Sequence, residues 1–95
     1  MRVIAKKALI IFYTKHPNSE SPLLAWHQII KNSGYIGFND LRETFPSVDK
    51  VNNYYVFNIG GNNFRLIAAI HFSSQILFIR EILTHSEYDK RGWKK

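Results

Sequence analysis

Hydrophobic residues recur at two different spacings along this chain, and the spacing changes near its middle. Within residues 5–16 (AKKALIIFYTKH), apolar residues lie three and four positions apart, which predicts a helix that ends before Pro17. Ile10 and Ile11 widen the apolar stripe, so a strand is the alternative for this segment. A second helix is predicted to begin at Ser21 and Pro22 and to bury Trp26 and its neighbours at helical spacing.

The second half of the chain has the composition of strands. Residues 54–59 (YYVFNI), 63–72 (NFRLIAAIHF) and 76–83 (ILFIREIL) are rich in aromatic and β-branched residues, and GGNN and SSQ supply the turns between them. We therefore expect an α+β fold with two N-terminal helices packed on one face of a twisted antiparallel sheet of three or more strands. Residues 1–95 are expected to form a single domain.

Two arginines interrupt the most hydrophobic hairpin. If Ser73 and Ser74 form a two-residue turn, Arg65 lies opposite Ile82, and Arg80 lies opposite Ile67. The residues predicted to face the helices are Phe64, Leu66, Ala68, Ile70, Phe72, Leu77, Ile79 and Leu83. Both arginines would then be diagonal neighbours on the opposite face, together with Ile82.

Adjacent guanidinium groups repel one another unless an anion lies between them. A phosphate fits this position, because guanidinium groups bind phosphate oxygens in pairs. Alternatively, Glu81, Glu87 or Asp89 neutralises the arginines, or their ends reach solvent.

The composition narrows the class of partner and compartment. A net charge of +6 and a pI near 9.8 indicate an anionic partner, whether nucleic acid, an acidic protein or a membrane surface, or else simply keep the protein in solution. The chain has no cysteine, so disulfides and thiolate metal sites are excluded and a reducing compartment fits. Neither a signal peptide nor a membrane span is predicted, so we expect a cytoplasmic protein with no membrane partner.

The last residues, THSEYDKRGWKK, concentrate groups that suit RNA chemistry. His85 and Lys90 can exchange protons or stabilise negative charge, while Tyr88 and Trp93 can stack on unpaired bases. An ordinary polar tail is the alternative. His16, His27 and His71 are interpreted as structural, and we predict no metal site and no cofactor.

The combination of YYVFNIGGNNFRLIAAIHF with FIREILTHSEYDKRGW resembles the HigB-type toxins of bacterial toxin–antitoxin systems, which are members of the RelE superfamily. The resemblance implies a ribosome-dependent mRNA endonuclease that cuts the codon in the ribosomal A site. It also implies a HigA-like helix-turn-helix antitoxin as partner, with operator DNA bound only through that antitoxin.

The resemblance also suggests site residues. Arg65, Arg80 and Tyr88 correspond to an Arg–Arg–Tyr type of active site, whereas His85 and Asp89 resemble a second type. The catalytic candidates are Arg65, Arg80, His85, Tyr88 and Lys90, and the RNA-binding candidates are Lys6, Lys7, Asn58, Asn62, Arg91 and Trp93.

The expected chemistry is metal-independent attack by the 2′-hydroxyl of the RNA, which needs a base, an acid and positive charge at the phosphate. Two alternatives are a basic RNA-binding module without catalysis and a protein-interaction domain that docks an acidic partner.

Overall fold

Five strands form one mixed sheet, and four α-helices accompany it in the part of the chain that the computed structural model describes, residues 1–90. The elements follow in the order β1 (Arg2–Ile4), α1 (Lys7–Lys15), the 3-10 helix η1 (Pro17–Ser19), α2 (Glu20–Lys31), α3 (Phe38–Thr44), β2 (Asp49–Val51), β3 (Tyr54–Ile59), β4 (Phe64–His71), β5 (Ile76–Thr84) and α4 (His85–Lys90). The strand order is β1-β5-β4-β3-β2. The predicted α+β class is confirmed.

The sheet is not wholly antiparallel, which corrects the prediction. β1 pairs in parallel with β5, and Arg2 lies opposite Ile76. β1 and β2 have three residues each, too few to show an alternating pattern, and they lie at the two edges of the sheet. The hydrophobic pattern therefore predicted β3, β4 and β5 but neither edge strand.

The second helix begins before the predicted position. α2 starts at Glu20, so Ser21 is not its N-cap. Ser19 occupies that position, and its hydroxyl donates to the carbonyl oxygen of His16 instead of capping the helix. Pro22 still fits within the first turn, where backbone N–H groups have no partner inside the helix.

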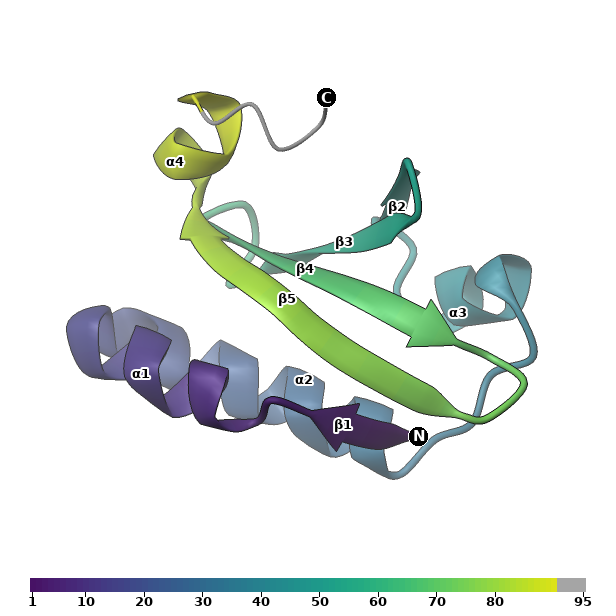
Figure 1. The fold of residues 1–95 in the computed structure, drawn as a ribbon. Coiled ribbons are helices and arrows are strands. Elements are labelled where there is room, and N and C mark those ends of the chain that lie inside the picture. Colours follow the sequence, from purple (N-terminus) through teal and green to yellow (C-terminus); the bar gives the residue numbers. More distant parts are fainter. Residues whose placement is uncertain (91–95) are drawn as a thin grey trace.

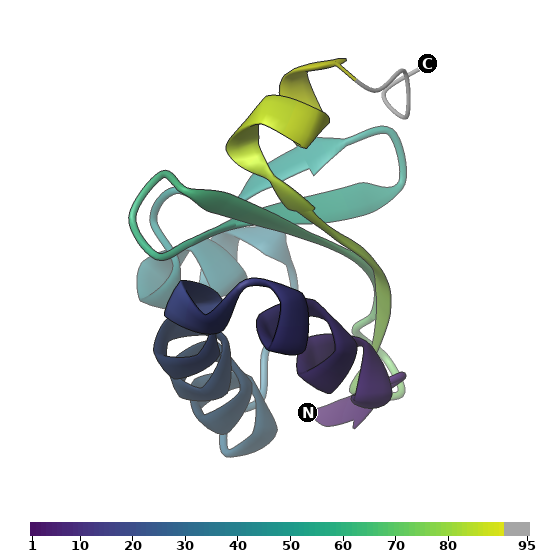
Figure 2. The ribbon, with the colours of Figure 1, turned by 90° about the vertical axis from the view of Figure 1, so that its left-hand side faces the viewer.

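The main core lies between the helices and one face of the sheet. Figures 1 and 2 show α1 and α2 side by side beneath the sheet and α4 above it. Side chains from both layers share one buried cluster, which includes Leu9, Leu23, Trp26, Ile30, Phe57, Leu66, Ala68, Leu77 and Ile79. No helix among residues 1–90 has the length and hydrophobicity to cross a membrane.

A β-bulge in the β4–β5 hairpin changes the register that the sequence predicted. Ala69 pairs with Phe78 as expected, but beyond the shift at Ile67/Ala68 the residue opposite Ile67 is Glu81. Arg80 is the extra residue, so the predicted pairing of Ile67 with Arg80 is wrong.

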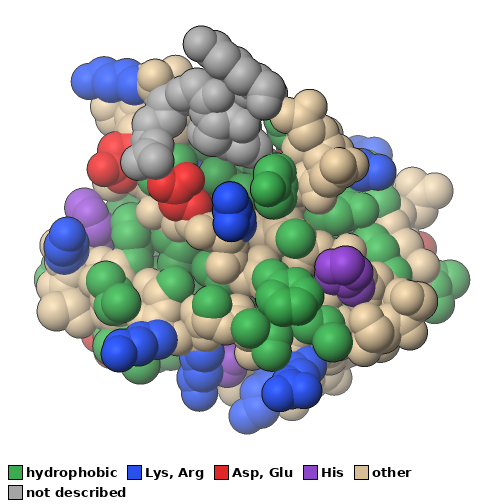
Figure 3. Space-filling view, viewed as in Figure 1, with side chains coloured by type: hydrophobic (Ala, Val, Ile, Leu, Met, Phe, Trp, Pro, Cys, Tyr) green, Lys and Arg blue, Asp and Glu red, His purple; other side chains and the backbone are tan. Residues whose placement is uncertain are grey.

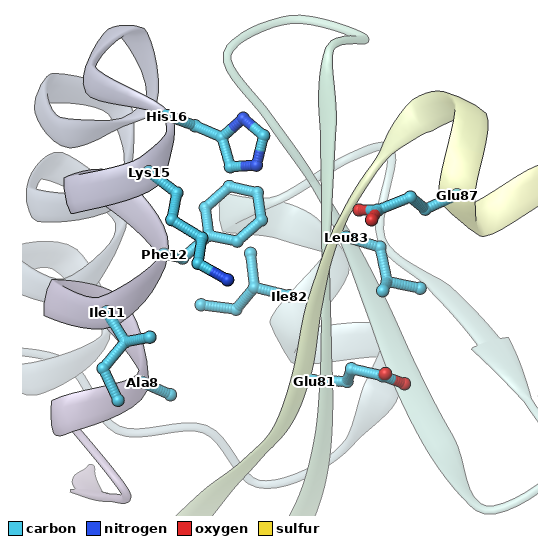
Figure 4. Close-up of a pocket in the computed structure, with 9 residues that line it drawn as sticks. All are labelled: Ala8, Ile11, Phe12, Lys15, His16, Glu81, Ile82, Leu83 and Glu87. Atoms are coloured by element: carbon cyan, nitrogen blue, oxygen red, sulfur yellow. The ribbon is translucent and has the colours of Figure 1, made fainter.

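The same shift moves Arg65 opposite Leu83 instead of Ile82 and exchanges the faces of the residues that follow. Ile82 packs against the main core, whereas Leu83 joins a second cluster with Val56, Ile67 and Tyr88 on the α4 side. Figure 4 shows Ile82 directed toward Phe12 of α1, across a groove of about 300 Å³, while Leu83 points the other way. The predicted placement of Ile82 and Leu83 was therefore reversed.

The position of Leu66 makes the core testable. Its side chain is fully buried (0% exposed), so Leu66→Ala should lower the free energy of unfolding by about 2–5 kcal/mol. The measurement is equilibrium urea unfolding, with Ile36→Ala as the control because Ile36 is 91% exposed. A loss below about 1 kcal/mol for Leu66→Ala would contradict the observed packing.

His27 makes stability depend on pH. Burial, reinforced by the nearby charges of Lys6 and Lys31, lowers the pKa of this imidazole below 6.5. The unfolded chain then takes up the proton at a higher pH than the folded protein does, so the free energy of unfolding should fall as the pH drops below about 6.5. Urea unfolding of His27→Gln at several pH values should show a shallower decline than the parent chain, and parallel curves would exclude this origin.

Candidate active site

The turn between β3 and β4 holds the start of α4 in place. Gly60 and Gly61 adopt left-handed backbone conformations (φ 61° and 68°), which favour glycine. The turn directs the carbonyl oxygen of Asn63 at α4, where it accepts a hydrogen bond of 2.9 Å from the backbone N–H of His85. Two segments more than 20 residues apart in sequence are joined here.

α4 has six residues and begins with a capping box. The Thr84 hydroxyl accepts from the N–H of Glu87 at 3.1 Å, and the Glu87 carboxylate accepts from the N–H of Thr84 at 2.9 Å. Leu83 and Tyr88 belong to the same buried cluster, and their positions before and inside the helix are those of a hydrophobic staple. These contacts fix the direction in which His85 and its helix leave the sheet.

Arg65 lies between the β3–β4 turn and α4, and its side chain contacts both. Its Nη1 donates to the carbonyl oxygens of Asn62 and Phe64, both at 3.1 Å. Its Nη2 donates to the Asn62 side-chain oxygen at 2.6 Å and to Nδ1 of His85 at 3.0 Å. The guanidinium carbon is 5.5 Å from the centre of the Tyr88 ring.

The contact with Arg65 assigns the tautomer of His85. A guanidinium group only donates hydrogen bonds, so Nδ1 of His85 must accept and carries no proton. The proton of the neutral ring is then on Nε2, which lies 3.3 Å from a carboxylate oxygen of Asp89. Arg65, His85 and Asp89 thus form one chain of polar contacts, a hydrogen bond from Arg65 to His85 and a contact of 3.3 Å from His85 to Asp89.

This chain runs from a buried residue to the surface. Arg65 is 8% exposed, whereas the side chains of His85 and Asp89 are 45% and 58% exposed. No carboxylate of residues 1–90 lies within ion-pair distance of Arg65, and its four hydrogen bonds go to neutral acceptors. Covered cations usually have an anionic partner, so the surroundings of Arg65 suit a bound anion.

Arg80 belongs to a different part of the same face. Its guanidinium carbon lies 6.0 Å from the centre of the Tyr54 ring, and it lines a hollow of about 240 Å³ with Tyr54, Ile67 and Glu81. Along β5 it is three residues from Leu83, the partner of Arg65, which corresponds to about 10 Å. The bulge therefore separates two arginines that the sequence placed as diagonal neighbours.

The sheet beside Arg80 exposes aromatic and basic groups that sequence reasoning did not identify as a site. His71 and Phe78 have ring centres 5.5 Å apart, and Lys50 lines a second hollow with Tyr54 and His71. We call Lys50, Tyr54, His71, Phe78 and Arg80 the aromatic–basic strip. Figure 3 shows hydrophobic and histidine side chains together on the surface over β4 and β5, with basic groups near them. Alternation along β4 and β5 was the available signal, since it gives Ala69, His71 and Phe78 one face.

The remaining catalytic and RNA-binding candidates lie partly on the α4 side of the sheet and partly elsewhere. Asn58 pairs with Arg65 across β3 and β4, so it lies beside the candidate site, and Lys90 is the last residue of α4. Lys6 and Lys7 lie at the start of α1, where Lys6 is close enough to affect the pKa of buried His27 in α2. Arg91 and Trp93 lie outside the described residues.

Three residues outside the list of catalytic and RNA-binding candidates had visible signals in the sequence. Asp89 follows His85 by four positions, the spacing that brings side chains together on a helix. Thr84 and Glu87 have the three-residue spacing of a capping box. Among residues 1–90, no three His, Asp or Glu side chains are grouped as metal ligands.

Comparisons with known proteins agree with the resemblance seen in the sequence. The family model of the HigB toxin, described as the RelE-like toxic component of a toxin–antitoxin system, matches residues 19–91. The mRNA interferase toxin HigB of Escherichia coli (strain K12) is 38% identical over 92 residues, covering 94% of this chain and 88% of that protein. The mRNA interferase HigB of Shigella flexneri has the same identity and coverage.

A more distant relative, the mRNA interferase HigB of Escherichia coli O6:H1, is 34% identical over 93 residues, covering 95% of this chain and 90% of that protein. These matches extend across both helical and strand-forming halves. The chain belongs to the HigB toxin family, and with it to the RelE-like toxic components of toxin–antitoxin systems.

Proposed function

We propose that this protein is an mRNA endonuclease that cuts the codon in the ribosomal A site by metal-independent attack of the RNA 2′-hydroxyl. The observation that carries the proposal is the Arg65–His85–Asp89 chain, which brings a guanidinium group, an imidazole and a carboxylate together on one face of the sheet. The names of the relatives, which are mRNA interferases, support the same substrate class.

Each part of the reaction has a candidate group on this face or on α4. Arg65 binds oxygens of the scissile phosphate and stabilises the negative charge that develops on them, and Arg80 binds a neighbouring phosphate. His85 accepts the proton of the 2′-hydroxyl, and Asp89 stabilises the resulting imidazolium through Nε2. Lys90, at the end of α4, donates a proton to the leaving 5′-oxygen. Tyr88 supports Arg65 with its ring.

The aromatic–basic strip is the surface for the nucleotides next to the cleaved bond. Arg80 and Lys50 offer positive charge to the RNA backbone, and Phe78, which is 39% exposed, offers a ring on which a base can stack. Asn58 and Asn62 border the same face at the α4 end. The ribosome would supply the remaining positioning of the codon.

Membership of a toxin–antitoxin family implies an antitoxin partner. We propose a HigA-like helix-turn-helix protein in this role, with operator DNA bound only through the antitoxin. The cytoplasm is the compartment where both partners and translating ribosomes meet.

One observation favours a second candidate, an RNA-binding module without catalysis. Both ring nitrogens of His85 already have partners in this structure, so the imidazole has no unshared lone pair. A protein that stayed in this state would bind RNA without activating a nucleophile.

A deoxy substitution tests the chemistry. An mRNA with 2′-deoxyribose at the scissile position should resist cleavage on programmed ribosomes, because it lacks the attacking hydroxyl. The all-ribose mRNA should yield an upstream fragment that ends in a 2′,3′-cyclic phosphate or its hydrolysis product, detected by mass spectrometry. Efficient cutting of the deoxy substrate would rule out this mechanism.

His85→Ala tests the proposed base. Loss of general-base catalysis should reduce the cleavage rate on ribosomes by about 10²- to 10⁴-fold. Ser86→Ala is the matched control, since Ser86 is the exposed neighbour in the first turn of α4, and it should cut at the parental rate. Equal rates for both variants would assign catalysis to other groups.

A further inference from the structure

The resting state of His85 conflicts with its role as a base. A base needs a lone pair directed at the substrate, and in this tautomer the lone pair is on Nδ1. Arg65 occupies that position with a hydrogen bond of 3.0 Å, and Asp89 occupies the other ring nitrogen. The imidazole becomes a base only if Arg65 leaves Nδ1.

Among residues 1–90, the guanidinium group of Arg65 is hydrogen-bonded only to neutral acceptors, which hold a cation less strongly than an anion does. Both hydrogens of its Nη2 are in use, one on Asn62 and one on His85, and its Nη1 donates to the carbonyl oxygens of Asn62 and Phe64. All of these acceptors are neutral, although the residue is 8% exposed. A phosphate adds an opposite charge to the contact and accepts two parallel N–H groups from one guanidinium, so it binds Arg65 more strongly than neutral acceptors do and can displace them.

We propose that Arg65 caps the base of the resting protein and that the RNA phosphate removes this cap. The phosphate binds the guanidinium group, Arg65 leaves Nδ1 of His85, and the lone pair becomes available next to the phosphate that brought about the change. The proposal rests on the proposed endonuclease function, and it makes the base dependent on the presence of substrate.

The step moves one proton to His85 and one proton from Lys90. The lone pair on Nδ1 takes the proton of the 2′-hydroxyl, the 2′-oxygen forms a bond to phosphorus, and the bond from phosphorus to the 5′-oxygen breaks. The 5′-oxygen keeps the electron pair and takes a proton from the Lys90 ammonium. The imidazolium of His85 then has a proton on each nitrogen and is stabilised by Asp89, which is already placed at Nε2.

The geometry allows Arg65 to change partners without unfolding the site. Its backbone stays in β4, and the Tyr88 ring at 5.5 Å provides a surface along which the guanidinium can shift. His85 does not depend on Arg65 for its position, since its backbone N–H is bound to Asn63 and its ring to Asp89. Loss of the cap therefore leaves the base in place.

Nitrogen NMR of the full chain, labelled at histidine and arginine, tests the exchange directly. The probe is a 2′-O-methyl oligoribonucleotide, which presents phosphates but cannot be cut. In the protein alone, Nε2 of His85 should be protonated and Nδ1 should be a hydrogen-bond acceptor. On titration, Nδ1 should move toward an unshared lone pair at the same RNA concentration at which the Arg65 signals shift.

Arg80→Gln is the matched control, because Arg80 lies on the same face and has no contact with His85. This variant should bind the probe more weakly and show unchanged His85 signals before RNA is added. A complex saturated with RNA in which Arg65 and Nδ1 keep their original signals would overturn the proposal.

Two substitutions of Arg65 provide an independent test by single-turnover cleavage on ribosomes. Arg65→Gln keeps an N–H group for Nδ1 but has no charge for phosphate, whereas Arg65→Lys keeps the charge. If phosphate must draw this residue away, Gln should slow cleavage by about 100-fold or more and Lys by less. If Arg65 is instead a permanent structural cap, Arg65→Gln should cut faster than Arg65→Lys. A cleavage rate of Arg65→Gln equal to or above that of Arg65→Lys would therefore overturn the proposal. This comparison of rates decides the question if the oligonucleotide shifts no NMR signals.

These results separate the cap from the proposed function. A parent chain that cuts no mRNA on ribosomes would refute the endonuclease, whereas the NMR titration would still show whether phosphate displaces Arg65. If the parent chain cuts mRNA and Arg65→Gln cuts at least as fast as Arg65→Lys, the cap is refuted and the endonuclease function is not.

Discussion

One extra residue in β5 determines which side chains reach the α4 face. Up to Ile79 the strand alternates as the hydrophobic pattern requires, and the bulge at Arg80 then reverses the alternation. Ile82 is thereby directed into the main core, and Leu83 is directed to the second cluster under α4. Without the bulge, α4 would lose the Leu83–Tyr88 contact, and Arg65 would have a different cross-strand partner.

The site also depends on a helix that is too short to be stable alone. Isolated helices below about 12 residues are marginal in water, and α4 has six. Its stability comes from the capping box of Thr84 and Glu87, from Tyr88 in the second cluster, and from the bond between the His85 N–H and Asn63. The β3–β4 turn and α4 therefore position each other, and Arg65 lies where they meet.

The sequence predicted most of the fold, and it supplied candidate site residues without the contacts between them. Strand β3 has the bounds that its aromatic and β-branched residues indicated, and the hairpin register is as predicted from His71 to Ala68. The bulge left no signal, because an arginine at position 80 fits either face of an alternating strand. The distance between Arg65 and Arg80 depends on that bulge, and the contact of Arg65 with His85 depends on how α4 leaves the sheet. Both arise from tertiary structure, which local periodicity does not encode.

The choice of arginine at position 65 is explained by charge more than by stability. Burying a cation without an anionic partner costs free energy, and the acceptors around Arg65 are all neutral, so stability alone does not explain an arginine here. A neutral donor would satisfy Nδ1 of His85 equally well, so the hydrogen bond alone does not require a guanidinium group. A guanidinium group differs from a neutral donor in its affinity for phosphate. Arg65 also contacts His85, the imidazole that the proposed reaction uses as its base once phosphate has bound. In the proposed mechanism, the residue that senses the substrate is the same residue that keeps the base inactive until the substrate arrives.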